Sequence, residues 1–199
     1  MGLVTHAERA YLGQVEASVG STIYDGDLLS TEIGGLLRIS NIALTLQLGQ
    51  ASSLTLHRAA APEDNLQAEL GSGTIMFSAG QTANVAVLAN DASIRPVAHA
   101  ATIAQIRIVN RKELRIYAQR GALNFSYHGE TEMVPEGTAY RVLLDPSEKE
   151  IDPPSESGQG RNPPAKVHAK FALLVIGMVA GGVIPMAGHH HHLESPDRP

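Results

Sequence analysis

Apolar and polar side chains alternate along residues 1 to about 144, and this period of two predicts β-strands. The clearest run places Leu44, Leu46 and Leu48 on one face of a single strand. Turn signals such as "DGD", "GSG", "ANDAS" and "HGE" recur between the runs. Many short strands separated by turns predict an all-β fold, which can be a short-strand β-sandwich, a barrel or a β-solenoid.

Two segments of this region have similar sequences, and we call this similarity the echo because it suggests an internal repeat. In "AELGSGTIMFSAG" and in "IYAQRGALNFSYHG" a strand is followed by a glycine and then by a second strand that carries a phenylalanine. Phe77 lies four residues after Gly73, and Phe125 lies four residues after Gly121. Two copies are fewer than the three or more repeats that a solenoid needs, so the echo suggests repetition only.

The composition changes twice after residue 144. Residues 145–170 contain five prolines and many charges but few apolar side chains, which predicts a flexible linker. Residues 171–188, "FALLVIGMVAGGVIPMAG", carry no charge. As a helix they would be roughly 27 Å long, close to the roughly 30 Å of a bilayer's hydrocarbon core. We predict a transmembrane helix, with a buried core helix as the alternative; its marker residues are Phe171, Leu174, Gly177, Gly181 and Ile184.

Two further expectations depend on that helix. Gly177 and Gly181 form a small-xxx-small pair, which would permit a homodimer through close helix contact. A short polar tail, residues 189–199, follows and contains four consecutive histidines, His189–His192. Histidine tracts bind divalent metals, but a tract at the end of a membrane helix fits the membrane interface better.

The carboxylates Asp25, Asp27 and Glu32 raise the question of acid–base chemistry. Glycosidases need two carboxyl groups opposed across a cleft, whereas "DGD" is a local turn. Gly26 gives that turn its backbone freedom, and the aspartates can accept hydrogen bonds from nearby amides. The strand that follows Thr31 is interrupted or bulged at Gly34 and Gly35. We therefore interpret the cluster as a turn and not as a catalytic site.

The composition narrows the function classes. The chain has a formal net charge of −5, which argues against nucleic acid as a partner. It has no cysteine, so disulfides and thiolate chemistry are excluded. Outside the tail the histidines are single and scattered, and no nucleophile or phosphate-loop motif is present. We predict no enzyme, no cofactor and no metal site.

A basic group follows in the second half of the β-rich region: Arg107, Arg111, Lys112, Arg115 and Arg120. In "RIVNRKELR" these side chains alternate with apolar ones, which is typical of a solvated strand face that discourages edge aggregation. A weak site for an anionic ligand is the alternative.

The run "LGQVEASVGSTIYDGDLLSTEIGGLLRISNIALTLQLGQASSLTLHR" resembles the FecR-type domain of bacterial envelope regulators. The "GD" of that pattern, its threonine and its glycine correspond to Gly26, Asp27, Thr31 and Gly35. The resemblance extends over about residues 11 to 144. It implies a non-catalytic all-β module that relays contact with another envelope protein.

The predicted function is therefore a membrane-anchored FecR-like module for protein interaction or envelope sensing, with an unidentified membrane or envelope protein as partner. The alternative is a tethered carbohydrate- or anion-binding module. Orientation stays open. Arg161, Lys166 and Lys170 precede the predicted helix and only Arg198 follows it, so the positive-inside rule places the β-domain in the cytoplasm. The family resemblance places it outside, and we see no export signal.

Overall fold

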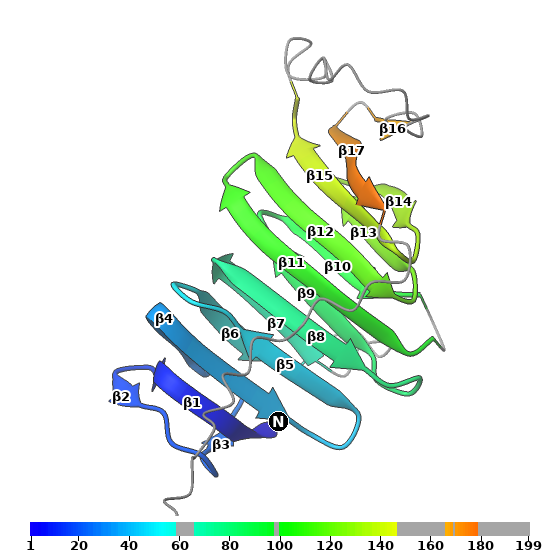
Figure 1. Ribbon diagram of the computed structural model, residues 1–199. Coiled ribbons are helices and arrows are strands. Elements are labelled where there is room, and N and C mark those ends of the chain that lie inside the picture. The colour runs from blue at the N-terminus through cyan, green and yellow to red at the C-terminus, as the bar shows by residue number, and fades with distance from the viewer. Residues whose placement is uncertain (59–65, 98–99, 147–165, 169, 179–199) are drawn as a thin grey trace, which may run out of the picture.

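The computed structural model describes residues 1–58, 66–97, 100–146, 166–168 and 170–178, and the following description is confined to them. All regular structure in these residues is β, as the alternation predicted. Figure 1 shows the strands stacked beside one another from β1 to β17, so the chain advances along the stack as it is read.

The strands form one hydrogen-bonded sheet that curls into two facing layers. Layer A contains, in spatial order, β1 (Gly2–Leu12), β4 (Leu28–Ser40), β5 (Leu44–Leu48), β8 (Thr74–Ala79), β11 (Thr102–Asn110), β12 (Glu113–Arg120), β15 (Thr138–Leu144), β17 (Phe171–Met178) and β16 (Lys166–Val167). Layer B continues from β4 through β6 (Ser53–His57), β7 (Leu66–Ser72), β9 (Val85–Ala89), β10 (Ala92–Pro96), β13 (Leu123–Tyr127) and β14 (Glu130–Val134). The short strands β2 (Val15–Glu16) and β3 (Thr22–Ile23) pair with β1.

The long strand β4 belongs to both layers. Its C-terminal half, Leu37 to Ser40, pairs with β5, and its N-terminal half, Leu28 to Ser30, pairs with β6. The pairing of β4 with β1 is irregular between Glu8 and Ala10, opposite the Gly34–Gly35 position where the sequence predicted a bulge. We call this bend, with β1 and β4, the folded end; at the opposite, open end β14 of layer B and β17 of layer A are separate strands.

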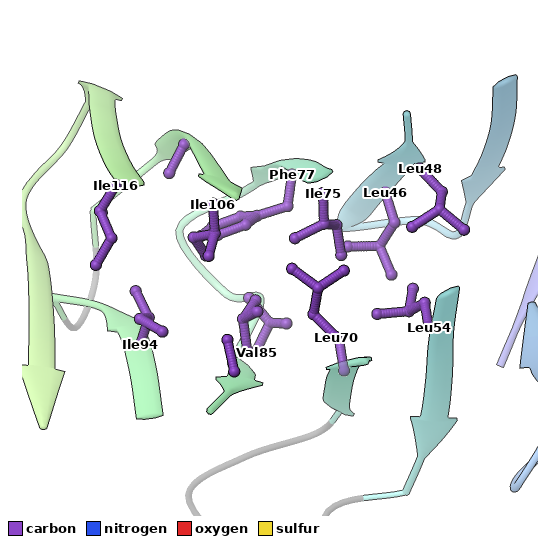
Figure 2. Close-up of a cluster of buried hydrophobic side chains, with 14 of the residues drawn as sticks. Leu46, Leu48, Leu54, Leu70, Ile75, Phe77, Val85, Ile94, Ile106 and Ile116 are labelled. Atoms are coloured by element: carbon purple, nitrogen blue, oxygen red, sulfur yellow. The ribbon is translucent and has the colours of Figure 1, made fainter. Parts of the chain in front are cut away.

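The core lies between the two layers. Figure 2 shows one row of side chains that includes Leu46, Phe77 and Ile106 facing a second row that includes Leu54 and Ile94. All five are 3% exposed or less. Because each strand turns every second residue inward, a core built largely of aliphatic side chains suffices despite the scarcity of aromatics.

The echo noted in the sequence marks two corners of the fold. Gly73 has φ +80° where the chain passes from β7 in layer B to β8 in layer A. Gly121 has φ +70° where it passes from β12 in layer A to β13 in layer B. A Cβ at Gly121 would lie 2.8 Å from Thr102 Oγ1, and one at Gly73 would overlap Ser52. Both corners therefore need glycine for conformation and for space.

The prediction of a helix over residues 171–188 is wrong for its first eight residues. Phe171–Met178 is strand β17, antiparallel to β15 from Leu144↔Phe171 to Thr138↔Met178. Phe171, Ala172 and Leu173 are fully buried, and Leu174 is 9% exposed. Side chains of both faces of this segment are buried, so its sequence shows no alternation and resembles that of an apolar helix.

Gly177 consequently lies in a strand opposite Ala139, and a helix-pairing face does not form there. Residues 179–199, with Gly181, Ile184 and His189–His192, lie outside the described residues. Within the described ranges, no helix has the length and apolarity that crossing a membrane requires. Membrane localisation stays a prediction from the sequence.

Candidate functional site

The turn at residues 24–27 is built by its own carboxylates. The amide of Tyr24 donates to Asp27 Oδ2 at 2.7 Å, and Gly26 has φ +83°. The amide of Arg58 donates to Asp25 Oδ1, also at 2.7 Å. Glu32 instead accepts a hydrogen bond from the hydroxyl of Tyr11 at 3.0 Å. The two aspartates thus bind backbone amides, and Glu32 has a different partner.

Thr31 and Gly35, the other residues matched to the FecR-type pattern, lie in β4 at the folded end. Thr31 is 7% exposed; its Oγ1 donates to the carbonyl of Gly49 and accepts from the amide of Ser52 at 3.1 Å. A Cβ on Gly35 would lie 2.6 Å from the carbonyl oxygen of Arg9. These residues position the bend between the layers, and their role as a family motif stays a prediction.

Three arginines form one row across the outer face of layer A. Arg107 of β11 lies directly opposite Arg115 of β12, and Arg115 lies directly opposite Arg141 of β15. Neighbouring strands are about 4.8 Å apart, so the row spans about 10 Å at the level of the backbone. Arg107 and Arg115 are exposed and Arg141 is half-buried. We call Arg107, Arg115 and Arg141 the arginine row.

Glu113 supplies a carboxylate to this row. Its Oε2 accepts a hydrogen bond from Arg141 Nη2 at 2.9 Å, and its Oε1 lies 3.9 Å from Arg115 Nε. Glu113 is only 8% exposed, one of few buried charged side chains in the described residues. Among the described residues, the row therefore brings together three guanidinium groups and one carboxylate, and it is predominantly positive.

The described outward-facing residues next to the row on the side away from Glu113 add no negative charge. The next outward-facing position on each strand is uncharged: Gln105 on β11, Tyr117 on β12 and Ala139 on β15. On β4, three strands away from β11, Arg38 adds a fourth cation and donates to Gln47 Oε1 at 2.8 Å. The outer face of layer A is therefore basic, although the chain as a whole is acidic.

The basic group predicted from the sequence is only partly assembled on this face. Arg107 and Arg115 belong to it. Arg111 and Lys112 lie in the turn between β11 and β12, and Arg120 lies at the far end of β12, opposite Ile103. Arg141 was not predicted, because it is 26 or more positions from Arg107 and Arg115 and reaches them only through the pairing of β12 with β15.

A second polar cluster closes the open end between the layers. His168 lies between two glutamates of β14, with Nε2 at 3.2 Å from Glu132 Oε2 and Nδ1 at 3.9 Å from Glu130 Oε2. Its ring stacks on Phe171 at 4.5 Å, and Phe171 meets Phe125 edge to face at 4.9 Å. Charged side chains that point inward from an edge strand protect that edge from pairing with other chains.

Tyr127 strengthens the same end of the fold. Its hydroxyl donates to Asp145 Oδ2 at 2.7 Å. Burial of the ring, followed by this hydrogen bond and the charge of Asp145, raises the pKa of Tyr127 to about 12. Among the described residues no group of three histidine, aspartate or glutamate side chains is arranged to hold a metal ion.

Comparison with known proteins does not assign this chain to a family. No family model matches the sequence, and no curated protein matches it. The chain resembles two crystal structures, at 2.50 and 1.65 Å resolution, of a provisionally assigned anti-sigma factor from Parabacteroides distasonis ATCC 8503. The sequence identities are 8% and 10% and the TM-scores 0.49 and 0.48. In each case 58% of this chain is covered, and the match spans 54% of the other chain.

Proposed function

We propose that this all-β domain is a non-catalytic binding module that recognises an acidic partner through the outer face of layer A. The observation that carries the proposal is the arginine row with its surplus of positive charge. Like charges directly opposite one another on adjacent strands destabilise a sheet. A bound anion relieves that repulsion, so binding and stability are coupled at this face.

The chemistry of the row favours oxyanions. A guanidinium group presents a planar fork of donors that matches a carboxylate or a phosphate, and such charge-assisted bonds are stronger than neutral ones. Arg107 and Arg115 are exposed, so their donors are accessible from solvent. The row lies across the outer face of a sheet, which suits a macromolecular partner better than a small substrate.

The FecR-type resemblance of residues 11 to 144 supports a signalling context, in which the acidic partner is an envelope protein. The proposal does not require a membrane anchor. β17 uses the first eight of the eighteen residues predicted to form one, and the remaining ten would make a helix of only about 15 Å.

The test measures binding of fluorescently labelled poly-L-glutamate to the full chain at low and at high salt. We expect binding that weakens as salt screens the charges, and a loss of at least about fivefold in affinity for Arg107→Gln. Arg58→Gln removes an equally exposed cation away from the row and serves as the matched control. Equal affinities of the two variants would contradict the proposal.

A further inference from the structure

We infer that Glu113 is an internal competitor for the arginine row, and that the row accepts an acidic polypeptide segment whose carboxylates take over the place of Glu113. This inference rests on the proposed function and specifies the ligand of the same face. Its basis is the position of a nearly buried carboxylate among cations that are themselves largely accessible.

The first step is the unequal pairing within the row. Glu113 lies within 4.0 Å of Arg141 and of Arg115. Among the described residues, no carboxylate lies within that distance of Arg107. One end of the row is therefore partly neutralised and the other is available. A ligand carboxylate will meet Arg107 first and must compete with Glu113 for Arg115.

The second step concerns where Glu113 comes from. Its backbone lies opposite Leu143 on β15 and opposite Asn110 on β11, one outward-facing position away from the row. Its side chain extends toward Arg115 and Arg141, which occupy the adjacent outward-facing positions of β12 and β15. The protein thus already holds a glutamate carboxylate against the row, which shows that a side-chain carboxylate fits there.

The third step is the choice of a polypeptide over a polyanionic glycan. Along an extended peptide, side chains on one face repeat at about 6.6 Å. Two acidic residues at this spacing therefore fit within a row that spans about 10 Å. Arginine side chains are long enough to reach carboxylates whose spacing differs from that of the arginine backbones. The carboxylate that the row already holds belongs to a glutamate side chain, which favours an acidic polypeptide over a sulfated glycan.

The decisive variant is Glu113→Gln, which keeps the shape of the side chain and removes its charge. For a twelve-residue glutamate-rich peptide, we expect affinity for this variant about fivefold tighter than for the unmodified chain, the effect of one additional unit of surplus charge at a partly exposed site. Glu16→Gln changes the net charge equally, at an exposed position in β2, and should leave affinity unchanged. If Glu113→Gln does not fold, Glu113→Asp keeps the charge but shortens the side chain that reaches Arg141, so tighter peptide binding by this variant would support the same competition.

The outcomes separate the inference from the proposed function. Peptide binding by Glu113→Gln that is unchanged or weaker, with binding by Arg107→Gln still impaired, would show that Glu113 only holds the strands together. That result would contradict the inference but not the proposed function. Preference for heparin over the peptide, with the same dependence on Arg107, would overturn the polypeptide as ligand. Absence of binding to either probe by every folded variant would remove the proposed function itself.

Discussion

The two ends of the sheet are closed by different means. At the folded end, the backbones of β1 and β4 continue from one layer into the other, and buried Thr31 and Ser52 are satisfied by hydrogen bonds to backbone groups. At the open end, β14 and β17 are distant in sequence and are linked through His168, which lies 3.2 Å from Glu132 of β14 and stacks on Phe171 of β17. Because the backbone is continuous at the folded end, we expect the fold to tolerate the loss of a side chain there but not an added atom that crowds the backbone. At the open end, we expect the loss of a side chain to cost more stability.

Phe171→Ala at the open end should have the largest effect. The ring is fully buried and packs edge to face on Phe125, so its removal should lower the free energy of unfolding by about 3–5 kcal/mol. Urea unfolding followed by circular dichroism measures this. Ile176→Ala, on the same strand but 52% exposed, should cost less than about 1 kcal/mol. Equal effects of the two variants would mean that β17 does not pack on the core in solution.

Gly35→Ala tests the folded end through the backbone. The added Cβ would lie 2.6 Å from Arg9 O and 3.0 Å from Glu32 O, and neither is the end of a flexible side chain. We expect a loss of about 2–3 kcal/mol in the same unfolding experiment. The control is Gly26→Asn, because that position has positive φ but open space around it and asparagine tolerates such a φ. A loss for Gly35→Ala no larger than that of the control would contradict the comparison.

Tyr127→Phe tests the open end through the pH dependence of the free energy of unfolding. Removing the hydroxyl should cost about 1 kcal/mol at neutral pH, because the hydrogen bond to Asp145 is lost. The pKa of Tyr127 is raised from 10.0 to about 12 in the folded chain, so its contribution is fully present below pH 10 and is lost as pH rises through 12.

Unfolding free energies at several values between pH 9 and pH 12 measure that loss. The unmodified chain should lose stability more steeply than Tyr127→Phe over this interval. Parallel curves would show that the phenol of Tyr127 ionises as easily folded as unfolded.

Asp27→Ala should have the smallest effect, about 0.5 kcal/mol, because it removes one exposed hydrogen bond to the amide of Tyr24. Asp27→Asn retains an acceptor oxygen and should recover most of that loss. Binding of the glutamate-rich peptide should be the same for both variants as for the unmodified chain. Loss of binding at unchanged melting temperature would show that the turn belongs to a binding site.

The sequence identified the features that are local. Alternation predicted the all-β fold because strands such as β5 bury every second side chain, Leu44, Leu46 and Leu48. The glycine echo marked the two corners at Gly73 and Gly121, since a corner needs a particular φ at one residue. The turn aspartates were interpreted as ligands of nearby amides, and the hydrogen bonds of Asp25 and Asp27 agree with that interpretation.

The features that depend on distant pairing were missed. β17 lacks alternation because Phe171 and Leu173 join the main core while Ala172 and Leu174 join a second apolar cluster with Leu143. The arginine row depends on the register between β11, β12 and β15, which no local pattern reveals. Glu113 belongs to "RIVNRKELR", the segment interpreted from the sequence as a solvated strand face, but the fold buries it against Arg141.

The position of β17 has a consequence for the chain as it is made. Protein synthesis proceeds from the N-terminus, so β1 and β4 emerge first and β17 emerges roughly 30 residues after β15. At about 5–20 residues per second, that interval lasts roughly 1.5–6 s. During it the edge of β15 has no neighbour and the ring of Phe125 has no Phe171 to cover it. The nascent chain is therefore most exposed to aggregation just before its last described strand arrives.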